Sequence, residues 1–539
     1  MAEIAGNALL SVFDKAGIEE FARELSELGW RIYASGGTAE TIKKAGVKVT
    51  DTSELSKGGA ILGHRVVTLA REIYAGLLAD DSKEQKAELE ALGIPRINLV
   101  CVDMYPLKEA IADPNASEAD IIEKTDVGGP TLLHAASKGR RIVLSRAEQR
   151  KEVIKWLKDG KPDEQVYVRK LAAVAEREVA NYMLKSAKYL GKGDTCGFIG
   201  DRKAQSSYGE NPWQGNAAFY VDVDDDDPLS IGRFELVEGI ALSYNNFTDV
   251  DRLLQTVTHA GATFDKNEKK VPAIVLGAKH GNLCGAAFDN DPIKAAKKML
   301  EGDLRAIFGG SIVVNTNMTR ELAETIMTYE MEEGRKRILD IVMAPGVDDD
   351  ALEILKRKNG KLRLLINPAL GKLTQDSLDK KLRSRYVRGG RLTQDNYTHV
   401  IDCSSEDVEK RGKPISDERM RDMQFAWAIG CTSSSNTICI VRDGMLLANG
   451  VGQQDRVTAA ELALMRAKNA GHDTKGAVAY SDSFFPFPDG PQILASAGIE
   501  GILTTRGSIR DKEVIDTLTE AGVSFCTFPD KEARGFYAH

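Results

Sequence analysis

The chain has 539 residues, more than one hydrophobic core usually spans, so its length predicts roughly two to four domains. With 42% hydrophobic and 28% charged residues, it has the composition of an ordinary globular protein, which excludes a fibrous or largely disordered chain. A net charge of -8 gives no general attraction for nucleic acid, although a local phosphate pocket is compatible with it.

The cysteines and histidines show no ligand or disulfide pattern. Seven cysteines are scattered without a CxxC pair, and seven histidines form no HExxH or HxH motif. These patterns predict reduced thiols and no catalytic metal. The first residues lack a basic stretch followed by an apolar run, and no run of about 18 apolar residues occurs. We therefore expect a soluble, cytoplasmic protein with no membrane or nucleic-acid partner.

The first part of the chain alternates strands and helices. Apolar runs predict strands at residues 8–13, 30–34, 97–103 and 142–145. Apolar residues at helical spacing predict helices over 18–28 and 39–45. Such alternation predicts a parallel sheet covered by helices.

A predicted helix over 166–189 ends in a stretch rich in glycine and small polar residues, Gly191 to Thr195, so we place a domain boundary near 195. The rest of the chain mixes apolar strands, such as 271–276 and 311–314, with helices such as 458–470. It is predicted to be a larger α/β region, and no solenoid-length repeat is evident in it.

The segment Ser35 to Thr38, SGGT, lies between a predicted strand and a predicted helix. Backbone N–H groups, a hydroxyl and the positive end of a helix can receive a phosphate there. A Gly-Gly pair is also a common tight connection. Asp14 and Lys15 follow the first strand and add a cation near the same edge of the sheet.

Two other clusters lie where this sheet would place a ligand. Asp103 to Pro106 follow a predicted strand, and Asp126 to Pro130 lead into a helix that contains Lys138. An aspartate, a tyrosine and a lysine at such positions could move protons on a ring-closing substrate. On spacing alone, a capping aspartate, a half-buried tyrosine and a solvated lysine are the favoured interpretation.

In the second part of the chain, Lys279 and His280 follow the strand predicted over 271–276, and Gly281-Asn282 and Cys284-Gly285 come directly after. A lysine beside a histidine at a strand end places a cation next to a proton acceptor, which acyl transfer to a weak amine needs. An isolated Lys-His pair is usually incidental, so this interpretation depends on the motifs around it.

Those motifs are Tyr208 to Pro212, Ser243 to Asn246, Phe308 to Gly310, Asp340 with Ala344 to Gly346, Ser435-Asn436, Gly452 to Arg456, and Asp482 to Gly490. In this order, and over nearly its whole length, the sequence resembles the bifunctional family AICAR transformylase/IMP cyclohydrolase. YGENP, SYNN, KH followed by CG, APG, SN, GQ with a following R, and FFPF with a following D match the transformylase part. SGGTA, RV with TL, YP and DxGG match the cyclohydrolase part.

The resemblance implies an α/β fold of two parts. A methylglyoxal-synthase-like parallel-sheet domain would cover 1–195. A transformylase region would cover 196–539, with two cytidine-deaminase-like α/β subdomains that divide near residue 370. It also implies a homodimer with transformylase sites at the subunit interface, and no tightly bound cofactor, because 10-formyltetrahydrofolate acts as a co-substrate.

In the transformylase part, the resemblance implies that His280 accepts a proton from the amine of the ribotide as that amine attacks the formyl carbon. Lys279 would supply positive charge, and Asn436 would orient the carboxamide and formyl groups. The residues implied to hold the ribotide are Tyr208, Gly309, Asp340 and Arg456. Those implied to line the folate site are Phe484, Asp489, Arg506 and Gly507. An arginine suits a phosphate or carboxylate, and an aromatic turn suits a flat pterin.

In the cyclohydrolase part, the resemblance implies that Tyr105, Asp126 and Lys138 carry the ring closure, in which the carboxamide nitrogen attacks the formamide carbon and water leaves. The residues implied to bind the nucleotide are Asp14, Lys15, Ser35, Gly36, Gly37, Thr38, Arg65 and Thr68.

Some positions depart from the family pattern. Ser207 replaces an arginine before YGENP, and Cys431 to Ser434 occupy basic positions before the SN pair. Val67 replaces a lysine, and Ala70-Arg71 replace a His-Pro pair. An alternative hypothesis is therefore a transformylase whose N-terminal domain is a nucleotide-binding or regulatory module. Retention of Asp126 and Lys138 favours the bifunctional enzyme. A zinc deaminase is set aside because its His/Cys ligand signature is missing.

Overall fold

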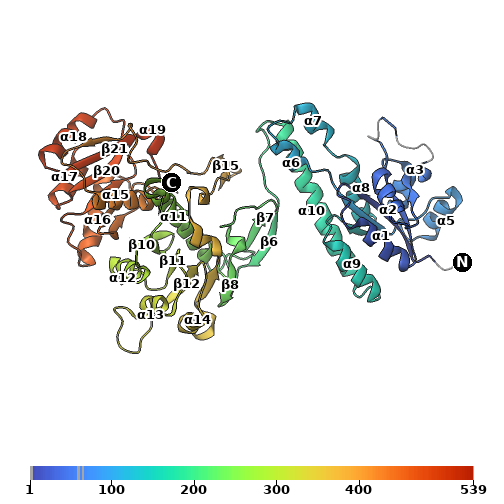
Figure 1. Cartoon of the computed structure of the whole chain (residues 1–539), viewed down its shortest axis with the longest axis horizontal. Coiled ribbons are helices and arrows are strands. Elements are labelled where there is room, and N and C mark those ends of the chain that lie inside the picture. The colour runs from blue at the N-terminus through green and yellow to red at the C-terminus, as the bar shows by residue number, and fades with distance from the viewer. Residues whose placement is uncertain (1–3, 57–60, 63–65, 538–539) are drawn as a thin grey trace. The chain divides into compact units, whose positions relative to one another are not determined.

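The computed structural model describes residues 4–56, 61–62 and 66–537. The chain forms two compact units, Met1–Gly200 and Asp201–His539. Figure 1 shows their elements in chain order. Within the described residues, no helix is both long and apolar enough to cross a bilayer.

The N-terminal unit is built on a five-stranded sheet with the order β3-β2-β1-β4-β5, in which every neighbouring pair is parallel. The strands are β1 (Gly6–Val12), β2 (Trp30–Ala34), β3 (Thr50–Asp51), β4 (Leu99–Asp103) and β5 (Ile142–Leu144). The predicted parallel sheet is confirmed. Its strand order reverses between β1 and β4, and ligands bind at the carboxyl ends of the strands at such a point.

Helices cover this sheet. They are α1 (Ile18–Glu27), α2 (Gly36–Lys44), α3 (Thr52–Leu55), α4 (Arg71–Leu78), α5 (Lys83–Leu92), α6 (Leu107–Ala112), α7 (Glu118–Glu123), α8 (Gly128–Lys138), α9 (Gln149–Lys158) and α10 (Glu164–Leu190). In α1, the buried residues Ile18, Phe21, Ala22 and Leu25 recur at the spacing of one helix face. Helix α1 contacts α2 and α9, whereas α8 contacts α4 and α10.

The C-terminal unit is built on one twelve-stranded sheet with the order β16-β21-β20-β19-β17-β18-β10-β9-β11-β12-β13-β8. Its first six strands in the chain are β8 (Glu235–Glu238), β9 (Ala273–Lys279), β10 (Asn282–Asp289), β11 (Gly310–Val314), β12 (Leu339–Ala344) and β13 (Arg363–Ile366). The other six are β16 (Glu409–Arg411), β17 (Ile438–Arg442), β18 (Met445–Gly450), β19 (Val478–Ser481), β20 (Gly501–Arg506) and β21 (Ser524–Pro529). Two-stranded sheets are formed by β6 (Gly200–Gln205) with β7 (Ala218–Asp222), and by β14 (Arg383–Val387) with β15 (Gly390–Gln394).

The two halves of the large sheet repeat one topology. The order β10-β9-β11-β12-β13-β8 in the first half corresponds to β18-β17-β19-β20-β21-β16 in the second. In each half the first three strands pair antiparallel and the next two pairs are parallel. The halves join through an antiparallel contact of β10 with β18, so they form one continuous sheet.

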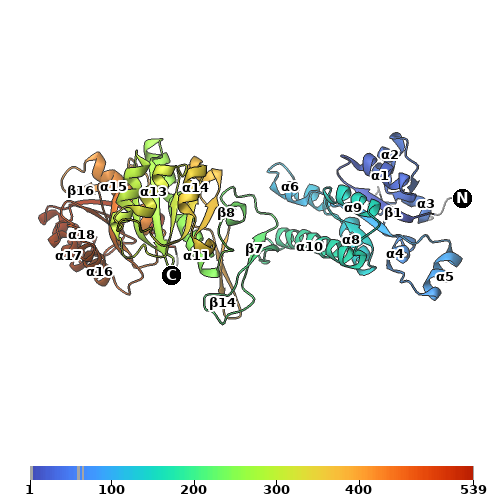
Figure 2. The same ribbon diagram turned by 90° about the horizontal axis from the view of Figure 1, so that it is seen from below.

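The helices of this unit repeat in the same way. They are α11 (Tyr244–Glu268), α12 (Pro292–Gly302), α13 (Arg320–Thr328) and α14 (Asp349–Leu355) in the first half, and α15 (Asp417–Gly430), α16 (Arg456–Asn469), α17 (Asp489–Ser496), α18 (Asp511–Glu520) and α19 (Asp530–Ala533) in the second. Helices α11 and α15 contact each other and share one core on one face of the sheet. The opposite face has separate cores under α12 to α14 and under α16 to α18. Figure 2 shows α13 and α14 on the other side of the sheet from α11.

Candidate active sites

In the N-terminal unit, the loops after β1 and β4 meet at the point where the strand order reverses. The Asp103 carboxylate accepts hydrogen bonds from the backbone N–H groups of Phe13 and Asp14, the latter at 3.3 Å. The Lys15 ammonium donates to the carbonyls of Val12 and Phe13. Burial lowers the pKa of Lys15 and raises the pKa of Asp103. A cation and a carboxylate are thus held at the floor of this site.

The SGGT segment lies beside this cation. Ser35 is the N-cap of α2, and its hydroxyl lies 2.8 Å from that of Ser11. The Thr38 hydroxyl lies 3.2 Å from both the N–H and the carbonyl oxygen of Val12. A Cβ added at Gly37 would lie 3.8 Å from Cε of Lys15. The structure therefore brings the start of α2 and Lys15 together, an arrangement that suits a phosphate.

Tyr105 and Asp126 lie on the other side of the β1–β4 switch point. The Tyr105 ring packs edge-on against Phe13, with the centroids 5.4 Å apart. Burial raises the pKa of Tyr105, and the Asp126 carboxylate raises it further. Burial also raises the pKa of Asp126, whose Oδ1 accepts from Gly129 N–H at 2.9 Å. The Asp126 carboxylate therefore lies close enough to the Tyr105 hydroxyl to influence its titration.

Tyr182 and Thr68 lie close to Asp126 and to the start of α8. Its N–H donates to the Tyr182 hydroxyl, on α10, at 2.7 Å. Burial raises the pKa of Tyr182 to about 12. Thr68 is buried, and a Cβ at Gly128 would lie 3.0 Å from its hydroxyl. Tyr182 was not predicted from the sequence, because an aromatic residue in a long helix carries no local signal of its partner.

Lys138 is not brought to this group. It is the last residue of α8, an eleven-residue helix that begins two positions after Asp126. At a rise of about 1.5 Å per residue, the two ends of this helix lie about 15 Å apart. The Lys138 side chain is exposed to solvent. Arg65, also predicted for this site, lies outside the described residues.

In the C-terminal unit, the predicted residues line one edge of the twelve-stranded sheet in two groups. The first group, at the end of β9 and the starts of β11 and β12, contains Lys279, His280, Gly309 and Asp340, with Tyr208 in a preceding loop. The second group lies at the start of β17 and after β18, β19 and β20. It contains Asn436, Arg456, Phe484, Asp489, Arg506 and Gly507.

Lys279 is the last residue of β9, and His280 and Gly281 form the turn that leads to β10. His280 and Gly281 have φ values of 55° and 69°, the left-handed conformation that a type I′ hairpin turn requires at both central residues. The Gly281 N–H donates to Oδ1 of Asp249, on α11, at 2.7 Å. The Lys279 ammonium donates to the Phe308 carbonyl at 2.6 Å. The His280 imidazole is exposed at the tip of this turn, and the hydrogen bond from Gly281 to Asp249 holds the backbone of the turn in place.

Asp340 and Tyr208 lie near two arginines. Nη1 of Arg357 is 3.9 Å from Oδ1 of Asp340. Burial lowers the pKa of Arg363, and the charges of Asp340 and Tyr208 oppose that shift, which places all three groups together. Arg363, at the start of β13, was not predicted from the sequence. Gly309 has a φ of 71°, so it permits the bend that precedes β11.

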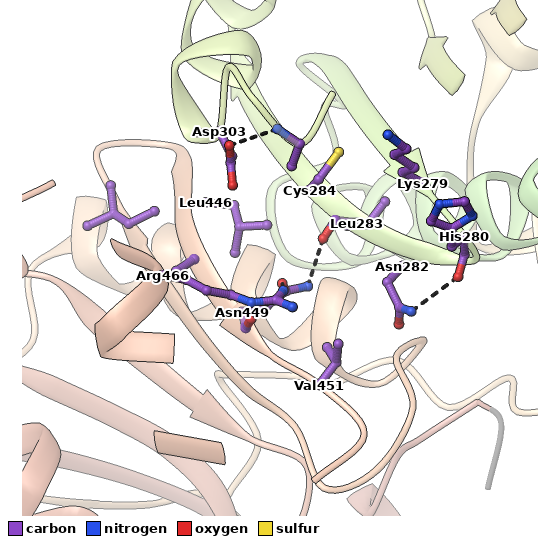
Figure 3. A pocket seen from close by; sticks show the side chains of 14 residues that line it. Lys279, His280, Asn282, Leu283, Cys284, Asp303, Leu446, Asn449, Val451 and Arg466 are labelled. Atoms are coloured by element: carbon purple, nitrogen blue, oxygen red, sulfur yellow. Dashed lines mark hydrogen bonds between the residues drawn. The ribbon is translucent and has the colours of Figure 1, made fainter. Parts of the chain in front are cut away.

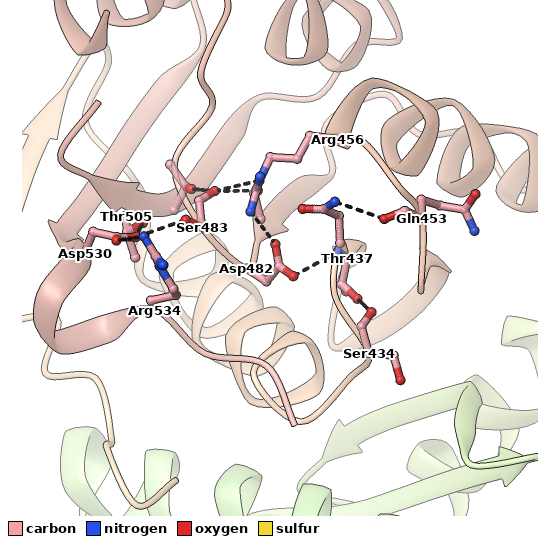
Figure 4. Close-up of polar contacts among 12 residues, drawn as sticks. Ser434, Thr437, Gln453, Arg456, Asp482, Ser483, Thr505, Asp530 and Arg534 are labelled. Carbon is pink, nitrogen blue, oxygen red and sulfur yellow. Dashed lines mark hydrogen bonds and ion pairs between the residues drawn. The ribbon is translucent and has the colours of Figure 1, made fainter. Parts of the chain in front are cut away.

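A buried carboxylate, Asp482, lies beside Arg456 of the second group, as Figure 4 shows. Asp482 follows β19, is 0% exposed, and its Oδ1 lies 3.1 Å from Nη2 of Arg456. The Asn436 amide donates to the Gln453 carbonyl at 2.9 Å. This contact fixes the Asn436 side chain beside the loop that leads to Arg456.

The folate-site candidates have mixed surroundings. The guanidinium of Arg534 lies 5.9 Å from the ring centroid of Phe484. Arg506 donates to the Thr527 carbonyl at 2.9 Å and pairs with Glu409 at 3.2 Å. The Arg506 guanidinium is therefore already held by protein groups.

A pocket of about 470 Å³ lies between the two groups, at the seam of β10 and β18. Figure 3 shows Lys279, His280 and Asn282 on one side of it and Asn449, Val451 and Arg466 on the other. The strand order β9-β10-β18-β17 puts three strand spacings of about 4.8 Å, or roughly 14 Å along the edge, between β9, which leads into His280, and β17, which follows Asn436. In one chain, the two groups of residues therefore lie on the same edge of the sheet, but they are too far apart to contact the same small part of a substrate.

The departures from the family pattern lie partly in the core. Cys431, Thr432 and Ser433 are 0%, 1% and 4% exposed, so they cannot contact a ligand in this structure. The Thr432 carbonyl instead accepts from the buried Arg252, on α11. Within the described part of the chain, no group of three or more His, Cys, Asp or Glu side chains is arranged to hold a metal ion.

Comparison with known proteins gives matches over both units. The family described as "AICARFT/IMPCHase bienzyme" matches residues 136–466, and the family described as "MGS-like domain" matches residues 17–131. A protein of Anoxybacillus flavithermus named "Bifunctional purine biosynthesis protein PurH" is 36% identical over 530 residues, which span 96% of this chain and 97% of that protein. A protein of the same name from Persephonella marina is 33% identical over 531 residues, with the same coverage of both chains.

Proposed function

The chain belongs to the AICARFT/IMPCHase bienzyme family, and from that premise we propose how its two units divide the chemistry. It is a bifunctional enzyme of purine biosynthesis that transfers a formyl group to AICAR and closes the product to IMP. The alternative of a transformylase with a purely regulatory N-terminal module is not favoured, because the similarity to bifunctional proteins extends over 96% of the chain.

For formyl transfer, we propose that the ribotide amine attacks the formyl carbon of 10-formyltetrahydrofolate while His280 accepts a proton from that amine. Lys279 stabilises the oxyanion that forms on the formyl oxygen. The C–N bond to the folate then breaks, and the proton goes to the departing folate nitrogen. The exposed imidazole on a fixed turn beside the 470 Å³ pocket is the single observation that carries this assignment.

The remaining residues of the two groups would bind the substrates. Tyr208, Gly309, Asp340 and Arg456 are proposed to hold the ribotide, and Asn436 to orient its carboxamide. We propose that Phe484, Asp489 and Gly507 line the folate site. Arg506 belongs at the edge of that site, because Glu409 and Thr527 already hold its guanidinium.

For ring closure, we propose that Lys15 and the start of α2, Ser35 to Thr38, bind the ribotide phosphate. Asp14 and Thr68 would contact the sugar. Asp126 takes a proton from the carboxamide nitrogen as it attacks the formamide carbon, and its raised pKa brings it closer to the working pH of a base. Tyr105 stays protonated because its pKa is also raised, so it can donate a proton to the formamide oxygen, which becomes a hydroxyl. That hydroxyl then takes the proton held by Asp126 and leaves as water, while the formamide N–H returns a proton to Tyr105 and a C=N bond forms. We assign no proton transfer to Lys138, because it lies at the far end of α8 from Asp126.

We propose a homodimer in which His280 of one subunit and Asn436 and Arg456 of the other face the same substrates. The separation of roughly 14 Å between these groups in one chain supports this arrangement. The proposed reactions need 10-formyltetrahydrofolate as a co-substrate and no tightly bound cofactor.

The test is an assay of the purified full-length protein with AICAR and 10-formyltetrahydrofolate, in which tetrahydrofolate and IMP are measured separately. Formation of both in equal amounts supports the proposal. Tetrahydrofolate formed without IMP would restore the regulatory alternative, and formation of neither would refute both.

A further inference from the structure

The internal repeat of the C-terminal unit allows equivalent positions to be compared. Asn315 follows β11 in the first half, and Asp482 follows β19 in the second. The strand registers pair Val314 with Val275 and Ser481 with Ile438. Asn315 and Asp482 therefore occupy equivalent positions, and so do the residues opposite them on the neighbouring strand, Ile274 and Thr437.

Both side chains make the same contact with the neighbouring strand. Oδ1 of Asn315 accepts from the Ile274 N–H at 2.7 Å, and Oδ2 of Asp482 accepts from the Thr437 N–H at 3.1 Å. The backbone N–H groups of Asn315 and Asp482 donate to the carbonyls of Ile274 and Thr437, each at 3.3 Å. A neutral amide is thus sufficient to brace this pair of strands.

At two equivalent positions, the second half has a charged residue where the first half has a neutral one. Helices α12 and α16 both begin after an aspartate N-cap, Asp291 and Asp455. The next residue is Pro292 in the first half and Arg456 in the second. In the first half, the neutral Asn315 occurs together with a proline at the start of the equivalent helix. In the second half, the charged Asp482 occurs together with an arginine at that position.

Burying a carboxylate costs free energy that an amide at the same position avoids. Asp482 is fully buried, and its second oxygen pairs with Nη2 of Arg456 at 3.1 Å. Nε of Arg456 donates to the Ser483 carbonyl at 3.3 Å. Within the described part of the chain, the hydrogen bonds of the Arg456 guanidinium come from Nε and Nη2 and none from Nη1, and 18% of the side chain is exposed. Two of the three guanidinium nitrogens, Nε and Nη2, are thus held by protein groups, and Nη1 is left to bind a ligand.

We infer that Asp482 is a positioning residue, whose charge fixes the Arg456 guanidinium so that it presents its free N–H groups to an anionic oxygen of the ribotide. This inference rests on the proposed role of Arg456 in formyl transfer. An arginine held in this way loses less conformational freedom when it binds an anion, so the loss of its anchor weakens binding.

The test compares Asp482→Asn with Arg456→Gln and with the double variant in the full-length protein. Asparagine keeps the contact to Thr437 that Asn315 makes to Ile274, so Asp482→Asn should fold with an unchanged melting temperature. We expect its KM for the ribotide in formyl transfer to rise about 10- to 100-fold, and more than its kcat falls. Ring closure of the formylated ribotide, assayed on the same protein, should keep its rate.

The double variant distinguishes positioning from a separate effect. If Asp482 acts through Arg456, Asp482→Asn adds little to the KM of Arg456→Gln, so the two effects are not additive. Additive effects, an unchanged ribotide KM in Asp482→Asn, or failure of that variant to fold would each overturn the inference. An unchanged ribotide KM in Arg456→Gln would instead refute the proposed role of Arg456 itself.

Discussion

His280 and Asp443 occupy the same position in two equivalent hairpin turns, with left-handed φ values of 55° and 53°. The glycine that follows each of them, Gly281 or Gly444, donates its N–H at 2.7 Å to an aspartate on the helix below. Those aspartates, Asp249 and Asp422, are each the sixth residue of α11 and α15. The two turns share one framework and differ in the side chain that they present.

The left-handed conformation of His280 decides which substitution is suitable for testing its role. Alanine would be strained at a left-handed φ, whereas asparagine tolerates it. We expect His280→Asn to lower formyl transfer by about 10²- to 10⁴-fold, the usual loss of a general base, with unchanged thermal unfolding. Asp443→Asn, the same change of turn residue in the other hairpin, is the matched control and should stay within a few-fold of wild type. Near-wild-type transfer by His280→Asn would remove His280 from the mechanism.

The sequence predicted the local elements well and the distant partnerships poorly. The strand predicted at 30–34 is β2, and the helix predicted over 458–470 matches α16, because their apolar periodicity is local. The repeat of two six-strand halves was expected only from the family resemblance and left no internal sequence repeat, since corresponding positions such as Pro292 and Arg456 differ. The two halves also share one sheet and the core between α11 and α15, which no local pattern indicates.

The candidate sites show the same division. Motifs placed Lys279 and His280 at a strand end and Asp126 before a helix, where the structure also has them, because strand ends and helix starts leave local signals in the sequence. Asp249 and Tyr182 contribute through a tertiary hydrogen bond to a backbone N–H, so their roles depend on which helix passes beneath the loop. The expectation that Lys138 acts with Asp126 stays a prediction, and the eleven residues of α8 separate the two positions along the chain.

Asp126 is expected to lower stability at neutral pH while it serves ring closure. Burial raises its pKa above the unfolded value, so the folded state favours the protonated acid. The penalty is absent below the unfolded pKa, grows as pH rises through the interval between the two values, and is constant above the folded pKa. Asp126→Asn should therefore melt at a higher temperature than wild type at pH 7, and the difference should shrink as the pH falls towards about 4 and be absent below that pH. A difference independent of pH would contradict this account.

Lys138 and Lys15 should differ in their effect on ring closure. Lys15 lies beside the start of α2, so Lys15→Met should raise the KM for the formylated ribotide by about tenfold or more, as expected for the loss of a charge-assisted hydrogen bond. Lys138→Ala should stay within a few-fold of wild type, because that side chain lies about 15 Å along α8 from the Asp126 end. IMP formation at varied substrate concentration measures both effects. A collapse of ring closure in Lys138→Ala would show that a second chain or a rearrangement brings this lysine into the site.

Mixed dimers test whether two subunits share the transformylase site. Two differently tagged variants, His280→Asn and Arg456→Gln, are co-expressed, and the dimers that carry both tags are isolated. If one subunit supplies His280 and its partner supplies Arg456, one of the two sites is intact, and about half of the wild-type activity should return. Dimers with His280→Asn in both subunits are the control. If each chain builds its own complete site, the mixed dimer gains no activity.

The central claim is that one chain carries two reactions on two separate units, and a two-step assay of two variants tests it most directly. His280→Asn and Asp126→Asn are each given AICAR with 10-formyltetrahydrofolate, and separately the formylated ribotide. We predict that His280→Asn closes the formylated ribotide at the wild-type rate but makes almost none of it from AICAR. Asp126→Asn should accumulate the formylated ribotide and form little IMP. If either substitution abolished both steps in folded protein, or if wild-type protein formed IMP only at the uncatalysed rate, the claim would be contradicted.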